Sequence, residues 1–269
     1  MRILYILLIV SGLASSVFGQ KAPGYMGKKT KIVYSGIISP VLGYPNSAGN
    51  SDLFSFNFSH NLSIERAANR IRSYAVALEM FSSKLDMTQN RFTELAYHPE
   101  FDFGNGGEDL VEFQAQDLID LRVLAVSLNS IRYGTGMAPF GVNFYWGVKV
   151  LMMEEDLTSS TFKSVSLDTY NSGNWGIEGS IYYVPKDDTY KTTTIGINFG
   201  GEINRAIQDV VVINLGVQST ILPTYVGTWF GGGSGGTPSF ESELEFQHKN
   251  RMVVHQIFSM KIGVGILLP

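Results

Sequence analysis

The chain has 269 residues, a formal net charge of −4 and charged side chains at only 16% of its positions. This weakly acidic balance argues against a nucleic-acid-binding protein, for which a basic surface is expected. The sequence contains no cysteine, which excludes disulfides, thiolate metal sites and a lipid anchor attached through cysteine.

The first nineteen residues have the organisation of a secretory signal peptide. Arg2 supplies a positive charge, residues 3–10 form an apolar run, and small residues lead to a cleavage site between Gly19 and Gln20. The apolar run is shorter than the roughly 20 residues that a membrane-spanning helix needs. We therefore expect residues 1–19 to be removed on export and residues 20–269 to form a single domain.

Eight strand-like segments follow, and the connections between them alternate in length. The segments span residues 29–40, 53–65, 71–87, 115–133, 140–156, 190–203, 208–221 and 252–268. Short turns occupy 66–70, 134–139 and 204–207, whereas 41–52, 88–114, 157–188 and 222–251 are longer. This alternation is typical of an up-and-down outer-membrane barrel, in which short turns face the periplasm and long loops face outward.

Most of these segments alternate apolar with small or polar residues at a period of two. The pattern is clearest in 53–65, where one face carries Phe54, Phe56 and Phe58. It is the pattern expected of a strand with one face towards lipid and the other towards a barrel interior. In 115–133, Asp120 and Arg122 share the parity of the apolar residues, which predicts a bulge or emergence of the strand above the membrane.

Several charged and amide residues have the parity of the inner face. They are Glu79, Lys149, Lys261, Glu202, Asn143 and Gln218. Eight strands enclose an interior that side chains can fill, and an unpaired charge would be costly there. The similar depth of Glu79, Lys149 and Lys261 therefore predicts an internal ion-pair network that plugs the barrel. A proton or ion relay through the same three residues is the alternative interpretation.

Two short motifs point to a family. The segment Ala22-Pro23-Gly24-Tyr25-Met26-Gly27-Lys28-Lys29 leads into the first strand, and Ala138-Pro139-Phe140-Gly141 leads into a strand of alternating aromatics. Both resemble small outer-membrane β-barrel proteins of Bacteroidota. The resemblance implies an eight-stranded barrel of the OmpA-like or opacity-like kind and brings no catalytic residues with it.

The remaining candidates for chemistry are weak. Residues 100–109 offer clustered oxygen ligands that could bind Ca²⁺ weakly, although a solvated exterior loop is the simpler interpretation: Asp102, Asn105, Glu108 and Asp109. The histidines show no metal-ligand spacing: His60, His98, His248 and His255. Because no nucleophile–base set stands out, we expect no enzymatic activity, no cofactor and no dedicated metal site.

Together these features predict an all-β fold: a closed antiparallel up-and-down barrel of eight strands, integral to the bacterial outer membrane and in contact with its lipid. We expect the exterior loops 88–114, 157–188 and 222–251 to contact a ligand or protein partner, because loops on a rigid scaffold carry binding. Three alternatives remain open at this point. They are a narrow channel or transporter for small or hydrophobic molecules, an accessory part of a secretion or motility complex, and a secreted soluble β-sandwich or lipocalin-like binder.

Overall fold

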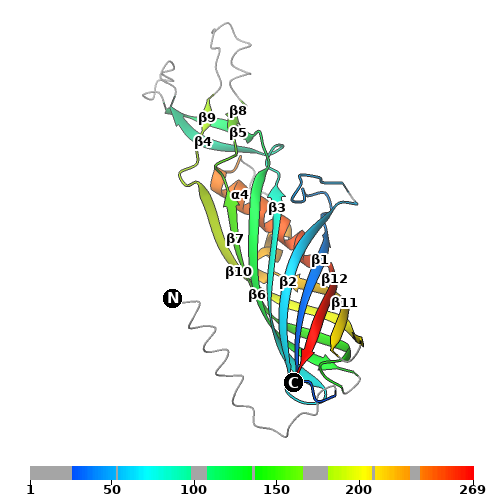
Figure 1. Ribbon diagram of the computed structural model, residues 1–269. Helices are drawn as coiled ribbons and strands as arrows, with labels where there is room; N and C mark the ends of the chain where they lie inside the picture. The colour runs from blue at the N-terminus through cyan, green and yellow to red at the C-terminus, as the bar shows by residue number, and fades with distance from the viewer. Residues whose placement is uncertain are drawn as a thin grey trace.

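The computed structural model describes residues 26–52, 54–97, 108–134, 137–165, 181–207, 210–230 and 237–269. The expected signal peptide at 1–19 lies outside these residues. The described part contains the strands β1 Thr30–Pro40, β2 Phe56–Ala67, β3 Arg72–Leu85, β4 Arg91–Tyr97, β5 Glu108–Ala115, β6 Ile119–Tyr133, β7 Gly141–Asp156, β8 Phe162–Ser164, β9 Tyr182–Tyr183, β10 Thr189–Ile207, β11 Val211–Ile221 and β12 Ser259–Leu268, and the helices α3 Pro223–Phe230 and α4 Phe240–Ile257 (Figure 1).

Eight strands form a closed antiparallel barrel in the order β1-β12-β11-β10-β7-β6-β3-β2 (Figure 1). Each barrel strand pairs with the barrel strands before and after it in the sequence, and β1 closes the barrel by pairing with β12. Closure leaves no free sheet edge, so the backbone polar groups of the wall satisfy one another. The predicted eight-stranded up-and-down barrel is confirmed.

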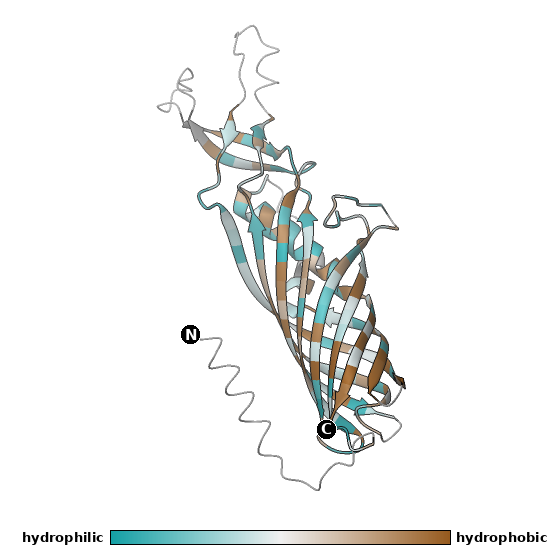
Figure 2. Ribbon diagram, viewed as in Figure 1, coloured by the Kyte–Doolittle hydropathy of each residue, from teal (hydrophilic) through white to brown (hydrophobic). Residues whose placement is uncertain are grey.

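The outer face of the barrel is apolar over a continuous band. Large side chains point outward on every barrel strand, and some are extensively exposed, such as Phe144 at 73% and Trp146 at 67%. Figure 2 shows hydrophobic positions along the lower part of these strands. His60 is a polar residue on this apolar face. Its side chain has a hydrogen-bond partner there, because Nδ1 lies 2.6 Å from the Tyr34 hydroxyl oxygen. A closed barrel with such a band is built to contact lipid, so the protein is an integral outer-membrane protein and the soluble β-sandwich alternative is excluded.

Above this band the outer face of the strands becomes polar and the inner face becomes apolar. On β6, Asp120 and Arg122 point outward while Leu121 and Val123 are buried on the inner face. The register of β6 with β3 and β7 runs through these positions without an extra residue. The parity of Asp120 and Arg122 therefore reflects a strand that rises out of the apolar band, and no bulge is present.

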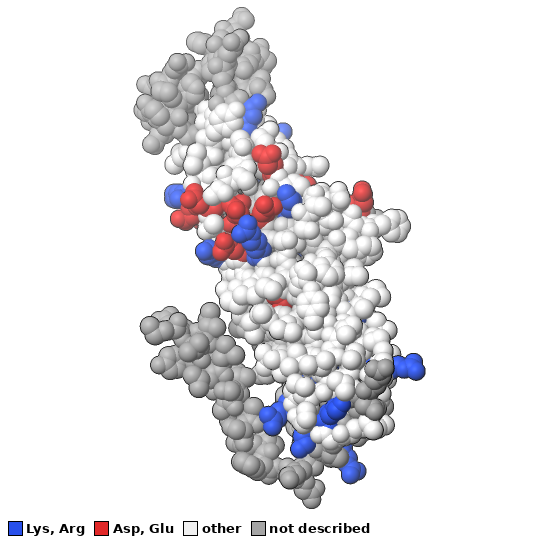
Figure 3. All heavy atoms as spheres, in the orientation of Figure 1, with Lys and Arg blue, Asp and Glu red and all other residues white. Residues whose placement is uncertain are grey.

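Charged pairs cover the outside of the barrel at this upper level. Lys84 lies 3.3 Å from Asp120, and Lys191 lies 3.1 Å from Glu154. Figure 3 shows acidic and basic side chains gathered between the uncharged wall of the barrel and the extracellular part of the molecule. This mixed belt marks the level at which the wall meets the polar outer surface of the membrane.

The long connections are more ordered than predicted. Residues 88–114 and 157–188 contribute the four-stranded sheet β4-β5-β8-β9, and residues 222–251 contain α3 and most of α4. The prediction of one strand over 252–268 is wrong in its first part, because α4 continues to Ile257 and β12 begins at Ser259. We call α3, α4 and this sheet the extracellular head. Among the described residues, no helix combines the length and hydropathy needed to span a membrane.

Candidate functional site

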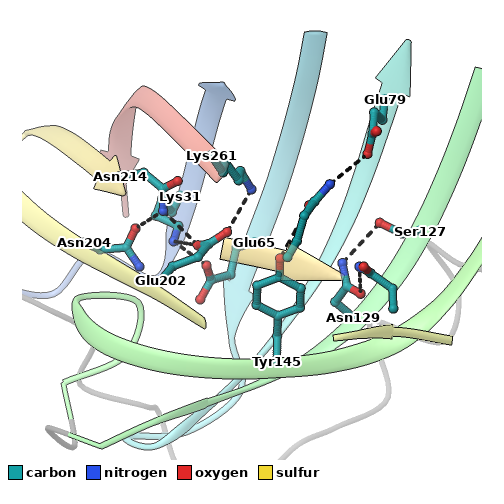
Figure 4. Close-up of polar contacts among 12 residues, drawn as sticks. Lys31, Glu65, Glu79, Ser127, Asn129, Tyr145, Glu202, Asn204, Asn214 and Lys261 are labelled. Carbon is teal, nitrogen blue, oxygen red and sulfur yellow. Dashed lines mark hydrogen bonds and ion pairs between the residues drawn. The ribbon is translucent and has the colours of Figure 1, made fainter. Parts of the chain in front are cut away.

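Three lysine–glutamate pairs fill the lower lumen of the barrel. Every member is at least nine-tenths buried, and the nitrogen–oxygen distances are 2.7 Å for Lys31–Glu65, 2.8 Å for Lys149–Glu79 and 2.8 Å for Lys261–Glu202. Figure 4 shows Lys31 and Lys261 directed towards Glu202, whose second oxygen lies 4.0 Å from Lys31 Nζ. Pairing compensates charges that would otherwise be costly in a dry interior.

Small residues on the intervening strands make room for two of these pairs. Lys261 on β12 and Glu202 on β10 are both in register with Gly216 of β11. A Cβ at Gly216 would lie 2.8 Å from Glu202 Cγ and 2.8 Å from the Gly201 carbonyl oxygen. Lys149 on β7 likewise reaches Glu79 on β3 across β6, which presents Ala125 and Ser127 there. The sequence thus places a small residue where each pair crosses a strand.

Amide side chains extend the network. Gln218 donates from Nε2 to Glu79 Oε2 at 3.3 Å, and Tyr145 donates its hydroxyl to Gln218 Oε1 at 3.5 Å. Asn143 is buried on the inner face in register with Tyr133. The structure therefore brings Glu79, Lys149 and Gln218 together, places Glu202 with Lys261, and leaves Asn143 near the lower end.

Sequence reasoning missed the lowest pair. Lys31 and Glu65 are direct register partners on β1 and β2, and the Tyr133 hydroxyl donates to Glu65 Oε1 at 2.5 Å. The phase of β1 is hard to read because both of its faces are apolar around Ile37 and Ile38. The available signal was the shared inward parity of Lys31, Ser35 and Ser39, all of which are buried.

The space left between these side chains is small. Fifteen residues line a cavity of about 30 Å³, among them Lys31, Glu79 and Lys261. A cavity of this size holds one or two water molecules. This cavity can therefore hold water next to the ion pairs, and it is too small for a larger solute.

Helix α4 occupies the upper lumen and contacts the network directly. Gln256 Oε1 accepts a hydrogen bond of 2.9 Å from Lys149 Nζ, which also binds Glu79. At the adjacent position, the His255 ring stacks on Phe81 of β3 with 3.8 Å between ring centroids. The described part of α4 thus closes the lumen from the extracellular side, while its apolar residues pack on the apolar upper wall.

One charge in this plug is not compensated. Arg251 is completely buried, and its Nε donates to Ser83 Oγ at 2.9 Å. Its Nη1 and Nη2 have no hydrogen-bond partner, and no carboxylate among the described residues pairs with it. Burial lowers the pKa of the Arg251 guanidinium to about 10, so the group stays charged at neutral pH. Burial of Arg251 without a carboxylate partner is therefore an unfavourable contribution to the contact of α4 with the barrel.

Further contacts hold α4 to the upper wall. His248 Nδ1 forms a short contact with Glu155 of β7, and His248 Nε2 lies 3.3 Å from the Tyr225 hydroxyl of α3. At the start of α4, the Phe240 backbone N–H donates to Glu94 Oε1 of β4 at 2.8 Å. A carboxylate at a helix N-terminus is favourable both as a hydrogen-bond acceptor and as a negative charge. These contacts join α4 to the barrel below and to the sheet above.

The extracellular head has its own aromatic core. Phe92 of β4 lies 5.1 Å from Phe240 and 5.8 Å from Phe113 between ring centroids, and Phe162 lies 5.0 Å from Phe240. The opposite face of the sheet is solvent-exposed and carries Leu95 directly opposite Leu110, each 65% exposed. The head is thus a packed unit that carries the apolar pair Leu95 and Leu110 on its outer surface.

Part of the predicted weak calcium site lies outside the described residues. Asp102 and Asn105 are outside the described residues, and Glu108 and Asp109 form the start of β5. His98 is also outside the described residues. Within the described ranges, no group of three or more metal-ligating side chains comes together.

No family model matches the chain, and no curated protein matches it at a significant level. Among solved structures, it is similar to Ail, the attachment invasion locus protein of Yersinia pestis, in complex with the heparin analogue sucrose octasulfate (9% identity, 89% of this chain and 97% of that chain, TM-score 0.36). It is also similar to the N-terminal β-barrel domain of Pseudomonas aeruginosa OprF (9% identity, 90% and 98% of the chains, TM-score 0.34). A third is OprG from the same organism (9% identity, 91% and 96% of the chains, TM-score 0.34). Likeness at this level concerns the barrel fold alone.

Proposed function

We propose that the protein is a non-conducting, non-enzymatic outer-membrane anchor that presents its extracellular head to a ligand or protein partner outside the cell. The observation that carries this proposal is the filled lumen. Three buried ion pairs occupy its lower part and α4 occupies its upper part. The narrow-channel alternative would require α4 to leave the barrel and the Lys149–Glu79 pair to separate.

The head supplies the surface for such an interaction. Its sheet packs on α4 through an aromatic core, which keeps the outer face of the sheet in a fixed position above the barrel. That face exposes the opposed leucines Leu95 and Leu110, and Tyr182 and Val184 are exposed on the same sheet and just after it. Exposed apolar residues on a rigid support are a common starting point for a protein contact.

Site-specific cross-linking tests the interaction part of the proposal. Because the chain contains no cysteine, Leu95→Cys or Leu110→Cys gives a unique attachment point for a photoreactive group. We expect a discrete adduct in cells that produce the protein from both positions. Ala48→Cys is the matched control, since Ala48 is an exposed extracellular residue in the separate connection between β1 and β2.

Planar-bilayer recording tests the anchor part. The purified barrel is expected to give no reproducible conductance steps. Regular steps from the intact protein, or cross-linking of the same strength at positions 48, 95 and 110, would contradict the proposal.

A further inference from the structure

The periplasmic end of the barrel carries a row of outward-facing arginines. Arg66, Arg72 and Arg132 lie at the lower ends of β2, β3 and β6, which are neighbours in the wall. All three are exposed and have the same outward parity as the lipid-facing residues above them. In Figure 3 the lower end of the barrel shows basic side chains and no acidic ones on the visible face.

The three arginines are close enough to share one ligand. Arg72 and Arg132 are direct cross-strand partners, and Arg66 is in register with Tyr74, two residues from Arg72. Direct partners in a sheet have Cβ atoms about 5 Å apart, and diagonal neighbours are about 7 Å apart. Like charges at these positions repel each other. Among the described residues no carboxylate lies within 4.0 Å of any of the three guanidinium groups, so the repulsion is not compensated by the protein.

An apolar strip rises directly above this row. On β3 the outward residues after Arg72 are Tyr74, Val76 and Leu78, and Leu128 lies beside Val76 on β6. The arginines therefore mark the line where the apolar band ends and the head groups of the inner leaflet begin. The short turns identify this end as periplasmic.

We propose that Arg66, Arg72 and Arg132 form a binding site for an anionic phospholipid of the inner leaflet. The phosphate accepts hydrogen bonds from the guanidinium groups, and an acyl chain lies along the strip from Tyr74 to Leu78. Arginine suits this role because its planar group binds phosphate oxygens in a bidentate manner and remains charged. The bound anion removes the repulsion between Arg72 and Arg132. This site is independent of any extracellular partner.

The test is lipid binding by native mass spectrometry of the full-length mature barrel, supplied with phosphatidylglycerol and phosphatidylethanolamine in equal amounts. The wild-type protein is expected to retain phosphatidylglycerol preferentially. The triple variant Arg66→Gln/Arg72→Gln/Arg132→Gln is expected to bind it on the order of 100-fold more weakly, since each basic residue near a membrane surface contributes roughly a fivefold effect.

The matched control removes three outward-facing basic residues from the other end of the barrel. Lys84→Gln/Arg122→Gln/Lys191→Gln makes the same change in net charge and is expected to leave the lipid preference unchanged. The variant Arg66→Lys/Arg72→Lys/Arg132→Lys keeps the charge but loses the bidentate geometry. Its affinity for phosphatidylglycerol should therefore fall between those of the wild type and the triple Gln variant. A heat-modifiability gel on each variant confirms that the barrel is folded.

Three results would overturn the proposal. The first is that the Arg66→Gln/Arg72→Gln/Arg132→Gln variant keeps the wild-type preference for phosphatidylglycerol. The second is that the control variant loses this preference to the same extent. The third is equal affinity for soluble glycerol phosphate and for phosphatidylglycerol, which would show that the acyl chain has no part in the site.

Discussion

The lower and upper halves of the lumen are both filled, but by opposite chemistry. Below, the wall fills itself with its own side chains, and each buried lysine has a glutamate partner. Above, the inner wall is apolar and a separate element, α4, fills the space. The lower half therefore depends on charge matching, which a single substitution can break. The upper half depends on hydrophobic packing, in which the loss of stability grows with the apolar volume that is removed. This half also contains one unpaired charge, Arg251.

The largest effect is expected from breaking a pair in the lower half. Lys149→Met leaves Glu79 buried with only the Gln218 contact at 3.3 Å. Removing one partner of a buried pair costs about 3–5 kcal/mol of unfolding free energy. Denaturant unfolding in detergent measures this loss, and a Glu79→Leu/Lys149→Met double variant should recover most of it.

The control for this prediction is Lys191→Met, which breaks the exposed pair with Glu154. An exposed pair contributes roughly 0–1 kcal/mol, so its removal should change the free energy of unfolding very little. Equal losses from Lys149→Met and Lys191→Met would mean that the lower lumen is hydrated enough to screen its charges.

A more local effect, with a lower minimum, is expected in the upper half. Met252 of α4 is completely buried in the core that joins helix and wall, and Met252→Ala should cost about 2–5 kcal/mol. The loss should appear as faster hydrogen exchange in α4, with exchange in the barrel strands unchanged. Uniform acceleration through the barrel would show that the two halves unfold as one unit.

The smallest effect is expected to have the opposite sign. Arg251→Met removes the buried guanidinium whose Nη1 and Nη2 have no partner, and keeps an apolar stem of similar length. Replacing buried ionic groups with apolar residues is often neutral or stabilising, and we expect a gain of about 1 kcal/mol. A clear loss of thermal stability would indicate that the guanidinium is well solvated by buried water.

Much of the barrel could be predicted from the sequence, because alternation at period two is a local signal that closure of the sheet preserves. The same alternation located Glu79, Lys149, Lys261 and Glu202 on the inner face. Lys31 was missed because β1 is apolar on both faces where it crosses the lumen. Small residues such as Gly216 could be recognised as spacers only once the register of three strands was known.

Helix α4 was harder to predict, since a helix enclosed by protein on most sides does not show a single apolar stripe. Its buried residues include His248, Arg251, His255 and Gln256 beside apolar ones, which masks the period. The apolar run Met252-Val253-Val254 then extended the predicted last strand upstream. A signal was present at the other end, where Ser239 caps the helix and Glu241 and Glu243 lie in its first turn.

The most direct test of the closed lumen is the reactivity of a single cysteine placed below α4. Ser127 lines the lower cavity and is nearly isosteric with cysteine, and the chain has no native thiol. In intact cells, Ser127→Cys should resist a membrane-impermeant maleimide and react only after denaturation, whereas Ser159→Cys, in the exposed extracellular turn after β7, should react at once. Rapid labelling at position 127 in the folded protein would contradict the account, because it would show an open path past the helix.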